Sequence, residues 1–261
     1  MGDKTYFAAR FDRTLERERL ACLEASLDPH STRTLSALGV GAGWRCLEIG
    51  GGGGSFVRWL AGRGAQVVAL DIDTTYLETL DLPNVVVRRC DVVTEDLEPE
   101  AFDLVHCRLL LMHLTDPALV LRKMVAALRP GGWLCAEEWN VEDPVCDPAH
   151  PSAKDAMRLM RKMSQGFAST GINNQFGRDL PWLIQQLGLE DVRGEAVRTF
   201  ATGTHPYRRM ASIGMQLLRD RLVGPFFESD KEVDALLAVL ADQSLLSGSP
   251  TLVAMWGRKP P

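Results

Sequence analysis

The chain has 261 residues, of which 46% are hydrophobic and 24% charged, the composition of an ordinary globular protein with enough apolar residues for a full core. The formal net charge is −5, and acidic and basic residues are interspersed. The sequence therefore lacks the basic stripe with which nucleic-acid binders neutralise phosphates, and we expect no nucleic-acid partner. The densest basic positions, 208–209 and 219–221, are interpreted as a solvated helix face.

Nothing in the sequence suggests a membrane or an extracellular setting. No stretch approaches the roughly 20 apolar residues that a membrane-spanning helix needs. The polar residues 1–19 contain no apolar run before a small-residue cleavage site, so a secretory signal is not expected. The six cysteines are scattered without a C-x-x-C pair. We expect reduced structural thiols in a cytoplasmic protein, with neither a disulfide framework nor a zinc site.

Helical and strand patterns alternate along the first half of the chain. Residues 1–40 carry leucines at helical spacing, and Asp28-Pro29 is expected to break that helix. Short apolar runs then predict strands, and amphipathic stretches between them predict helices. The expected strands are residues 46–49, 66–70, 85–87 and 102–107, and the expected helices are residues 55–63 and 74–80.

The helix that follows is the best marked. Asp116 is a suitable N-cap, and Pro117 fits the first helical position. The helix is expected to stop at residues 129–132, where glycines can supply a left-handed cap, before a fifth strand at 133–138.

The second half is less regular. A proline-rich loop over 143–151 precedes helices at 154–167, 180–187, 206–222 and 231–240, with strands at 191–199 and 251–257. This order predicts an α/β fold with a doubly wound, mostly parallel sheet buried on both faces.

Five consecutive glycines, residues 50–54, join the first strand to its helix. In a doubly wound sheet this junction lies at the carboxyl edge, where ligands bind. Gly50, Gly52 and Gly54 form a G-x-G-x-G pattern, whereas no register gives the G-x-G-x-x-G of dinucleotide sites. The phosphate-binding Gly-Lys-Ser/Thr pattern is also absent.

Three acidic residues narrow the choice of ligand. Glu48 precedes the first glycine by two residues, and its carboxylate would repel a pyrophosphate but attract an ammonium group. Asp71 ends the second strand about 20 residues beyond the loop, where an acid can accept both ribose hydroxyls. Asp91 follows the third strand, within reach of an adenine amino group. Asp71 fits either adenosine-containing ligand, whereas Glu48 favours S-adenosylmethionine, which carries an ammonium and a sulfonium and no phosphate.

These motifs in this order resemble the class I methyltransferases that depend on S-adenosylmethionine. The resemblance covers roughly residues 40–140 and rests on residues 47–54, 69–71, 90–92, 102–105 and 128–132. It implies a Rossmann-like fold of seven strands, whose antiparallel last strand the segments 191–199 and 251–257 could supply. Gly51 and Gly53 depart mildly from the family pattern, which commonly has cysteine and threonine or serine there.

The resemblance also implies roles for individual residues. Glu48 and the backbone of Gly50, Gly52 and Gly54 would hold the methionine portion, and Asp71 the ribose. Ile72 would pack on the adenine face, while Asp91 and the backbone of Val92 would contact its edge. The segment 108–114 would face the methyl group, and Arg108 is a candidate partner for the ligand carboxylate or for an acidic substrate.

A general base is needed only if the acceptor atom is a hydroxyl, and histidine is suited to that role. His113 and His205 are the candidates, although His113 could equally be a packed histidine at a helix start. His106 lies within a strand and is expected to be structural. No metal is expected, because the fourth strand ends without an acid and adjacent strand residues Glu137 and Glu138 point to opposite faces.

The sequence thus predicts a single methyltransferase domain acting on a small organic acceptor, at oxygen rather than nitrogen, as in secondary metabolism. Its expected parts are an N-terminal lid at 1–40 with aromatic residues Tyr6, Phe7 and Phe11, a cofactor-binding core at 41–140, a substrate cap at 141–222 and a closing segment at 223–261. Two alternatives stay open: a cofactor-binding relative that catalyses a cyclisation or rearrangement, and a non-catalytic S-adenosylmethionine-binding protein. An oligomer is not indicated.

Overall fold

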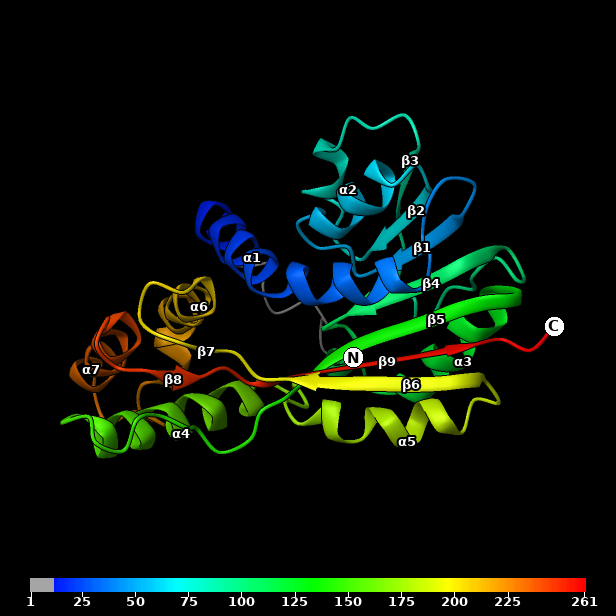
Figure 1. Ribbon diagram of the computed structural model, residues 1–261. Coiled ribbons are helices and arrows are strands. Elements are labelled where there is room, and N and C mark those ends of the chain that lie inside the picture. Colours follow the sequence, from blue (N-terminus) through cyan, green and yellow to red (C-terminus); the bar gives the residue numbers. More distant parts are fainter. Residues whose placement is uncertain (1–11) are drawn as a thin grey trace. The chain divides into compact units, whose positions relative to one another are not determined.

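Seven strands form one sheet in the computed structural model, which describes residues 12–261. Their order is β3-β2-β1-β4-β5-β9-β6 (Figure 1). Strands β1 to β5 pair in parallel, and β9 runs antiparallel to β6. The predicted doubly wound sheet with an antiparallel closing strand is therefore confirmed. The strands are β1 (Arg45–Ile49), β2 (Gln66–Asp71), β3 (Val85–Arg89), β4 (Phe102–Arg108), β5 (Leu128–Asn140), β6 (Glu190–Val197) and β9 (Thr251–Arg258).

The strand order places the loop after β1 at the point where the sheet changes winding direction. Strand β2 pairs with one edge of β1 and β4 with the other. The connections from β1 and from β4 therefore leave in opposite directions, and in doubly wound sheets ligands bind beyond the carboxyl ends of the strands at such a point. The glycine loop, Asp71 and Arg108 all lie at these strand ends.

The chain divides into two compact units, and the sheet belongs to the unit formed by residues 28–140, 175–197 and 252–261. One face of its central strands packs against α2 (Ser55–Gly62), where Phe56, Val57 and Leu60 are buried against Cys46 and Val67. The remaining helices of this unit are α3 (Pro117–Ala127), α5 (Leu180–Gln185) and the short 3-10 helices η2 (Leu77–Thr79), η3 (Leu111–His113) and η4 (Phe176–Arg178).

The first helix, α1 (Arg13–Ala37), continues through Pro29. The predicted break at Asp28-Pro29 is therefore wrong. A proline inside a helix removes one backbone hydrogen bond, but the turn around it is fixed by side-chain contacts: Asp28 accepts from Arg108, and Ser31 donates to Glu137. These contacts offset the lost bond, and they could not be read from the local sequence.

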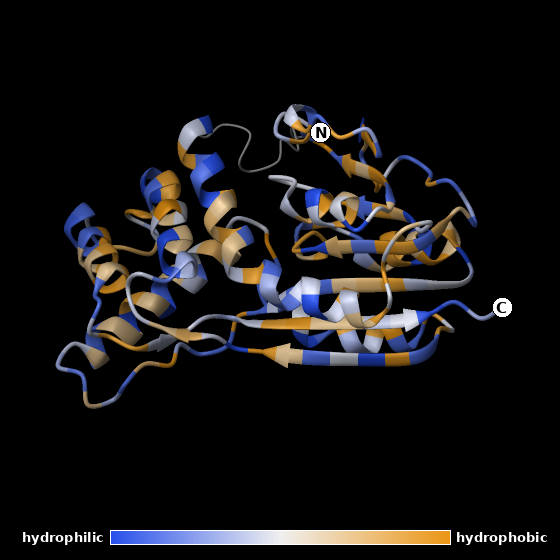
Figure 2. Cartoon of the chain, turned by 45° about the horizontal axis from the view of Figure 1, so that its top comes forward, coloured by the Kyte–Doolittle hydropathy of each residue, from blue (hydrophilic) through white to orange (hydrophobic). Residues whose placement is uncertain are grey.

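The other unit contains residues up to 27 together with 141–174 and 198–251. Its helices α4 (Ala153–Ser169), α6 (Pro206–Leu222) and α7 (Asp230–Ala241) share a core that includes Leu159, Leu218 and Leu236. Figure 2 shows short hydrophobic and hydrophilic blocks alternating along the helices, as expected for helices with one buried face. Strands β7 (Phe200–Ala201) and β8 (Ser247–Gly248) form a small second sheet, too short for a sequence pattern to reveal.

Several local predictions need correction. Arg208 is 1% exposed rather than solvated, because its guanidinium donates to the main-chain carbonyls of Leu240 and Leu245. Helix α3 ends at Ala127 through an extended Leu128, not through a glycine cap. Residues 74–80 contain only the single turn η2.

All six cysteines lie among the described residues and are free thiols. Within residues 12–261, no helix combines the length and the hydrophobicity required to cross a bilayer.

Candidate functional site

The glycine loop after β1 adopts a backbone conformation that side chains resist. Gly50, Gly52 and Gly54 have positive φ angles of 75°, 52° and 83°. A Cβ atom added to Gly54 would also come within 2.9 Å of a Leu80 methyl carbon. The amides of Gly50 and Gly51 both donate to the carbonyl of Leu70 at the end of β2, at 2.8 and 3.2 Å. The loop is thus a tight cradle that brings main chain, without side chains, to the carboxyl edge of the sheet.

Asp71 ties the end of β2 to this cradle. Its Oδ2 accepts from the Gly52 amide at 2.9 Å, and its Oδ1 accepts from the Asp73 amide at 3.0 Å. Burial raises the pKa of Asp71, while these backbone donors act in the opposite direction. The main chain of Ile72 also donates to this carboxylate. A carboxylate can accept about four hydrogen bonds, so acceptor capacity remains for a ribose hydroxyl group. The next side chain, Ile72, is an exposed apolar residue, 40% accessible.

Asp91 lies just beyond β3. Its Oδ1 accepts from the Val93 amide at 3.0 Å, and its own amide donates to Glu95 at 2.8 Å. The carbonyl of Val92 accepts from Lys123 at 3.2 Å. The turn that carries the predicted adenine contacts is therefore held in place by hydrogen bonds on both sides.

Glu48 has a partner that the sequence did not reveal. Glu48 on β1 and His106 on β4 are register neighbours, and Glu48 Oε2 lies 2.5 Å from His106 Nδ1. Burial raises the pKa of Glu48, and the neighbouring His106 opposes that rise. The Phe56 ring packs on the imidazole with 4.3 Å between ring centroids. His106, expected to be purely structural, therefore contacts the acid predicted to receive the ligand ammonium.

Arg108 is engaged by the part of α1 that follows residue 27. Its guanidinium donates to Asp28 and to Ser31, both at 2.8 Å. Asp28 also accepts from Ser55, the first residue of α2, at 3.1 Å. Neither Asp28 nor Ser31 carried a sequence motif, and both enter the site only because α1 docks on the sheet. A guanidinium has five N–H donors, so these contacts leave Arg108 able to bind a carboxylate as well.

One group of buried side chains offers potential metal ligands. Ligand atoms of His106, Cys135 and Glu137 lie within 4.8 Å of one another. Burial raises the pKa of the Cys135 thiol well above its ordinary value, which keeps the thiol protonated and a poor ligand. Ser31 donates to Glu137 at 2.5 Å. The absence of a functional metal stays a prediction.

Glu137 and Glu138 reach different partners, as strand alternation predicted. Glu137 meets Ser31 of α1, whereas Glu138 accepts from the amides of Leu110 and Leu111 in the loop after β4.

The two candidate bases lie in different units. His113 is half-buried at the end of η3 in the sheet-containing unit. His205 belongs to the other unit, where it caps α6 by accepting from the Tyr207 amide at 3.2 Å. Partial burial lowers the pKa of His205, which favours its neutral form. The catalytic role of either histidine stays a prediction, and Tyr6, Phe7 and Phe11 lie outside the described residues.

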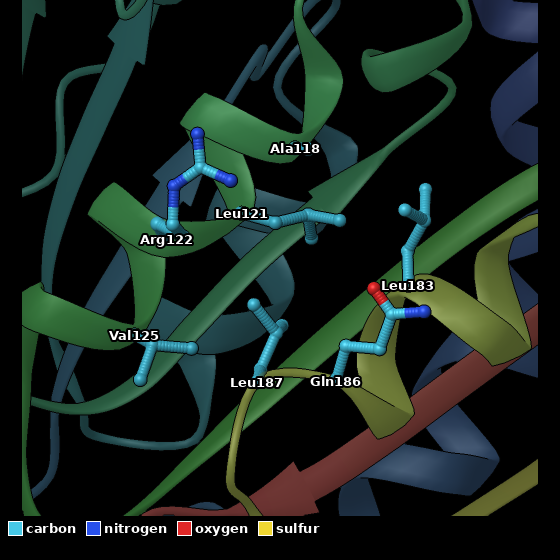
Figure 3. A pocket seen from close by; sticks show the side chains of 7 residues that line it. All are labelled: Ala118, Leu121, Arg122, Val125, Leu183, Gln186 and Leu187. Atoms are coloured by element: carbon cyan, nitrogen blue, oxygen red, sulfur yellow. The ribbon is translucent and has the colours of Figure 1, made fainter.

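A groove of about 290 Å³ lies elsewhere in the sheet-containing unit, between α3 and α5 (Figure 3). Figure 3 shows Leu121 and Val125 of α3 facing Leu183 and Leu187, with two polar side chains, Arg122 and Gln186, at its borders. None of the predicted site residues lines this groove.

The sheet order and the glycine loop at its switch point between β1 and β4 define a Rossmann-like α/β protein. A family model described as "Methyltransferase domain" matches residues 7–193. The chain belongs to this family. The resemblance predicted from the sequence is thereby confirmed.

Individual relatives agree with the family. The chain is 38% identical over 101 residues to a ubiquinone biosynthesis O-methyltransferase of Chromobacterium violaceum, a match that covers 36% of this chain and 43% of the relative. The match thus spans less than half of that curated protein. Methyltransferase str2 of Strobilurus tenacellus is 27% identical over 216 residues, covering 80% of this chain and 76% of the relative.

A solved structure supports the fold. Phosphoethanolamine N-methyltransferase 2 of Haemonchus contortus, in complex with S-adenosylhomocysteine and phosphomonomethylethanolamine, superposes with a TM-score of 0.56 at 19% identity. The superposition covers 94% of this chain and 53% of that chain. At this identity the likeness concerns the fold, and it confirms the predicted Rossmann-like architecture.

Proposed function

We propose that this protein transfers the methyl group of S-adenosylmethionine to a small organic acceptor. The observation that carries the proposal is the cradle after β1, whose Gly52 amide is bonded to Asp71 and whose entry strand carries Glu48. Membership of the methyltransferase family indicates methyl transfer as the class of reaction. The glycine cradle and the acids beside it are the reason for proposing S-adenosylmethionine as the methyl donor.

Charge distinguishes S-adenosylmethionine from the dinucleotides. A pyrophosphate at the cradle would approach the carboxylate of Glu48, which is electrostatically unfavourable in a partly buried site. An ammonium group gains from the same carboxylate, whereas Asp71 suits the ribose of either ligand. Asp71, exposed Ile72 and the turn at Asp91 fit the ribose and the adenine in the order in which they follow the cradle.

The bound cofactor supplies an activated methyl group on a sulfonium, which is an excellent leaving group. The chain itself must hold the acceptor in line with that methyl group and exclude water, effects worth about 7–11 kcal/mol when alignment is good. The segment 108–114, at and after the end of β4, is proposed to face the reacting atoms. His113 or His205 would accept a proton from a hydroxyl acceptor, adding about 10²–10⁴-fold.

Oxygen is the proposed acceptor atom. The support is the curated relative named an O-methyltransferase, which matches the chain over 101 residues. Action on a small molecule rather than a nucleic acid fits the interspersed charges and the net charge of −5. A role in secondary metabolism is proposed by analogy with small-molecule methyltransferases.

Calorimetry with S-adenosylmethionine and with NAD tests the cofactor. Binding of S-adenosylmethionine but not NAD supports the proposal, and tight binding of NAD alone contradicts it. Incubation with methyl-labelled cofactor and a panel of phenolic and carboxylic acceptors then tests the reaction. Label in the acceptor supports methyl transfer. An altered but unlabelled acceptor indicates rearrangement, and cofactor binding without any product indicates a binding protein.

A further inference from the structure

Glu138, near the end of β5, is 0% exposed and bonds to the loop after β4. Its Oε1 accepts from the amides of Leu110 and Leu111 at 3.0 and 2.6 Å. Its Oε2 lies 3.4 Å from the amide of Met112. One side chain thus serves three consecutive main-chain donors. Without it, the amides of Leu111 and Met112 would be left unpaired in buried residues, at a cost of about 1–3 kcal/mol each.

The backbone of this loop is strained where it leaves β4. Leu109 has a φ angle of 52°, a left-handed conformation that branched side chains rarely adopt and that costs about 1–3 kcal/mol. Its amide donates to the carbonyl of Glu137 at 2.8 Å. A strained turn persists only where its surroundings fix it, and here main-chain and side-chain groups of two adjacent β5 residues do so.

The same loop contacts the glycine cradle. A Cβ atom added to Gly50 would lie 3.3 Å from Cδ1 and 3.5 Å from Cβ of Leu110, so the Leu110 side chain packs directly on the first glycine. The amide of Leu110 is one of the three held by Glu138. The position of Leu110 against the glycine cradle therefore depends on the carboxyl group of Glu138, whose strand β5 lies two strands away from β1.

The main chain of Glu138 packs against the short helix η4. A Cβ atom on Gly177 in η4 would lie 2.8 Å from the Glu138 carbonyl oxygen, so η4 approaches the β5 main chain closely. Helix η4 also packs against η3. The Glu138 carboxyl group, the loop after β4 and η4 are therefore packed together.

We propose that Glu138 is a positioning residue, whose carboxyl oxygen fixes the loop 109–113 against the glycine cradle in the alignment that methyl transfer requires. This inference rests on the proposed function, since it assigns the loop to the reacting side of the cofactor. Glu138 touches neither cofactor nor acceptor and acts through the loop backbone.

Three variants separate this role from general stability. E138M keeps the volume but removes both oxygens. E138Q retains an acceptor oxygen for Leu110 and Leu111. D103N alters another buried carboxyl group, near the opposite end of β4 from the loop, which accepts from the Arg45 amide at 2.7 Å and pairs with Arg129. D103N is the matched control.

Hydrogen–deuterium exchange gives a readout that needs no turnover. Exchange of the amides in 110–112 should rise at least about tenfold in E138M, because one lost hydrogen bond is worth about that factor. The exchange of the Leu110 and Leu111 amides should stay close to wild type in E138Q, and that of all three amides in D103N. If E138M does not fold, E138D replaces it, because the shorter side chain withdraws the oxygen from the amides. Unchanged exchange in the folded variant would overturn the proposal.

Turnover gives the second readout. A small misplacement of the reacting groups can lower the rate about 100-fold, so kcat should fall by about that factor in E138M and be largely recovered in E138Q. An equal loss in E138M and D103N would overturn the positioning role. If the wild-type protein transfers no label, the proposed function fails, whereas the exchange result still decides whether Glu138 holds the loop.

Discussion

The imidazole Nδ1 of His106 lies 2.5 Å from the carboxylate of Glu48, on the adjacent parallel strand. Both side chains are buried, with 0% and 2% exposed surface. Two ionisable groups removed from water stabilise each other only as a pair, and removing one partner leaves the other without compensation. The acid that the sequence singled out therefore depends on a histidine 58 positions away.

A double-mutant cycle on this pair has a defined expected outcome. E48Q and H106Q should each lower the free energy of unfolding by about 3–5 kcal/mol, as for other broken buried pairs. The double variant should lose less than the sum of the two, with a coupling of at least about 1 kcal/mol. Denaturant unfolding of the four proteins measures this. Additive losses would show that the contact between Glu48 and His106 does not contribute to the free energy of unfolding.

Asp71 provides a direct test of the ribose contact. D71A should weaken S-adenosylmethionine binding at least about tenfold, because it removes the proposed hydroxyl acceptor and also frees the Gly52 amide. The fold should persist, since the sheet does not depend on this side chain. The exposed neighbour Asp73 supplies the control, and D73A should change the affinity much less. Calorimetry measures both, and equal affinities of D71A and wild type would remove Asp71 from the site.

Two glycine-to-alanine changes, one in the glycine cradle and one at the end of α2, test the strain in the cradle backbone. G54A places a side chain at a φ of 83° and within 2.9 Å of Leu80, so it should lower the stability by about 1–3 kcal/mol and weaken cofactor binding. Gly62 ends α2 and has open space around its missing Cβ. G62A should be neutral or stabilise by up to about 1 kcal/mol. Thermal unfolding with and without S-adenosylmethionine measures both, and equal effects would contradict the strain argument.

The features predicted correctly from the sequence are those that a local residue pattern determines. Alternating apolar strands, the Asp116 cap and the glycine motif located the sheet, helix α3 and the cradle. Contacts between distant segments were missed, because strand register and helix docking leave no local signal. The His106–Glu48 pair, the docking of α1 through Ser31 and the role of Glu138 belong to this group.

Ionisation of Glu138 should make stability depend on pH. Burial raises its pKa from 4.5 to about 8, although the backbone donors of Leu111 and Leu110 oppose the rise and the nearby Glu137 adds to it. Between these two values the folded protein holds a proton that the unfolded chain has released. The free energy of unfolding should therefore fall as the pH rises through this window, by up to about 1.4 kcal/mol per pH unit, and level off above it.

The E138Q variant isolates this contribution from those of other buried acids such as Glu48. Glutamine cannot ionise, so the difference in unfolding free energy between wild type and E138Q should change steadily in favour of E138Q from about pH 5 to about pH 8. Well below pH 4.5 the wild-type acid is neutral in both states, and the two proteins should differ by a constant amount. Denaturant unfolding at one-unit pH steps measures the difference. A difference that does not vary with pH would mean that Glu138 has an ordinary pKa and holds the loop as an anion.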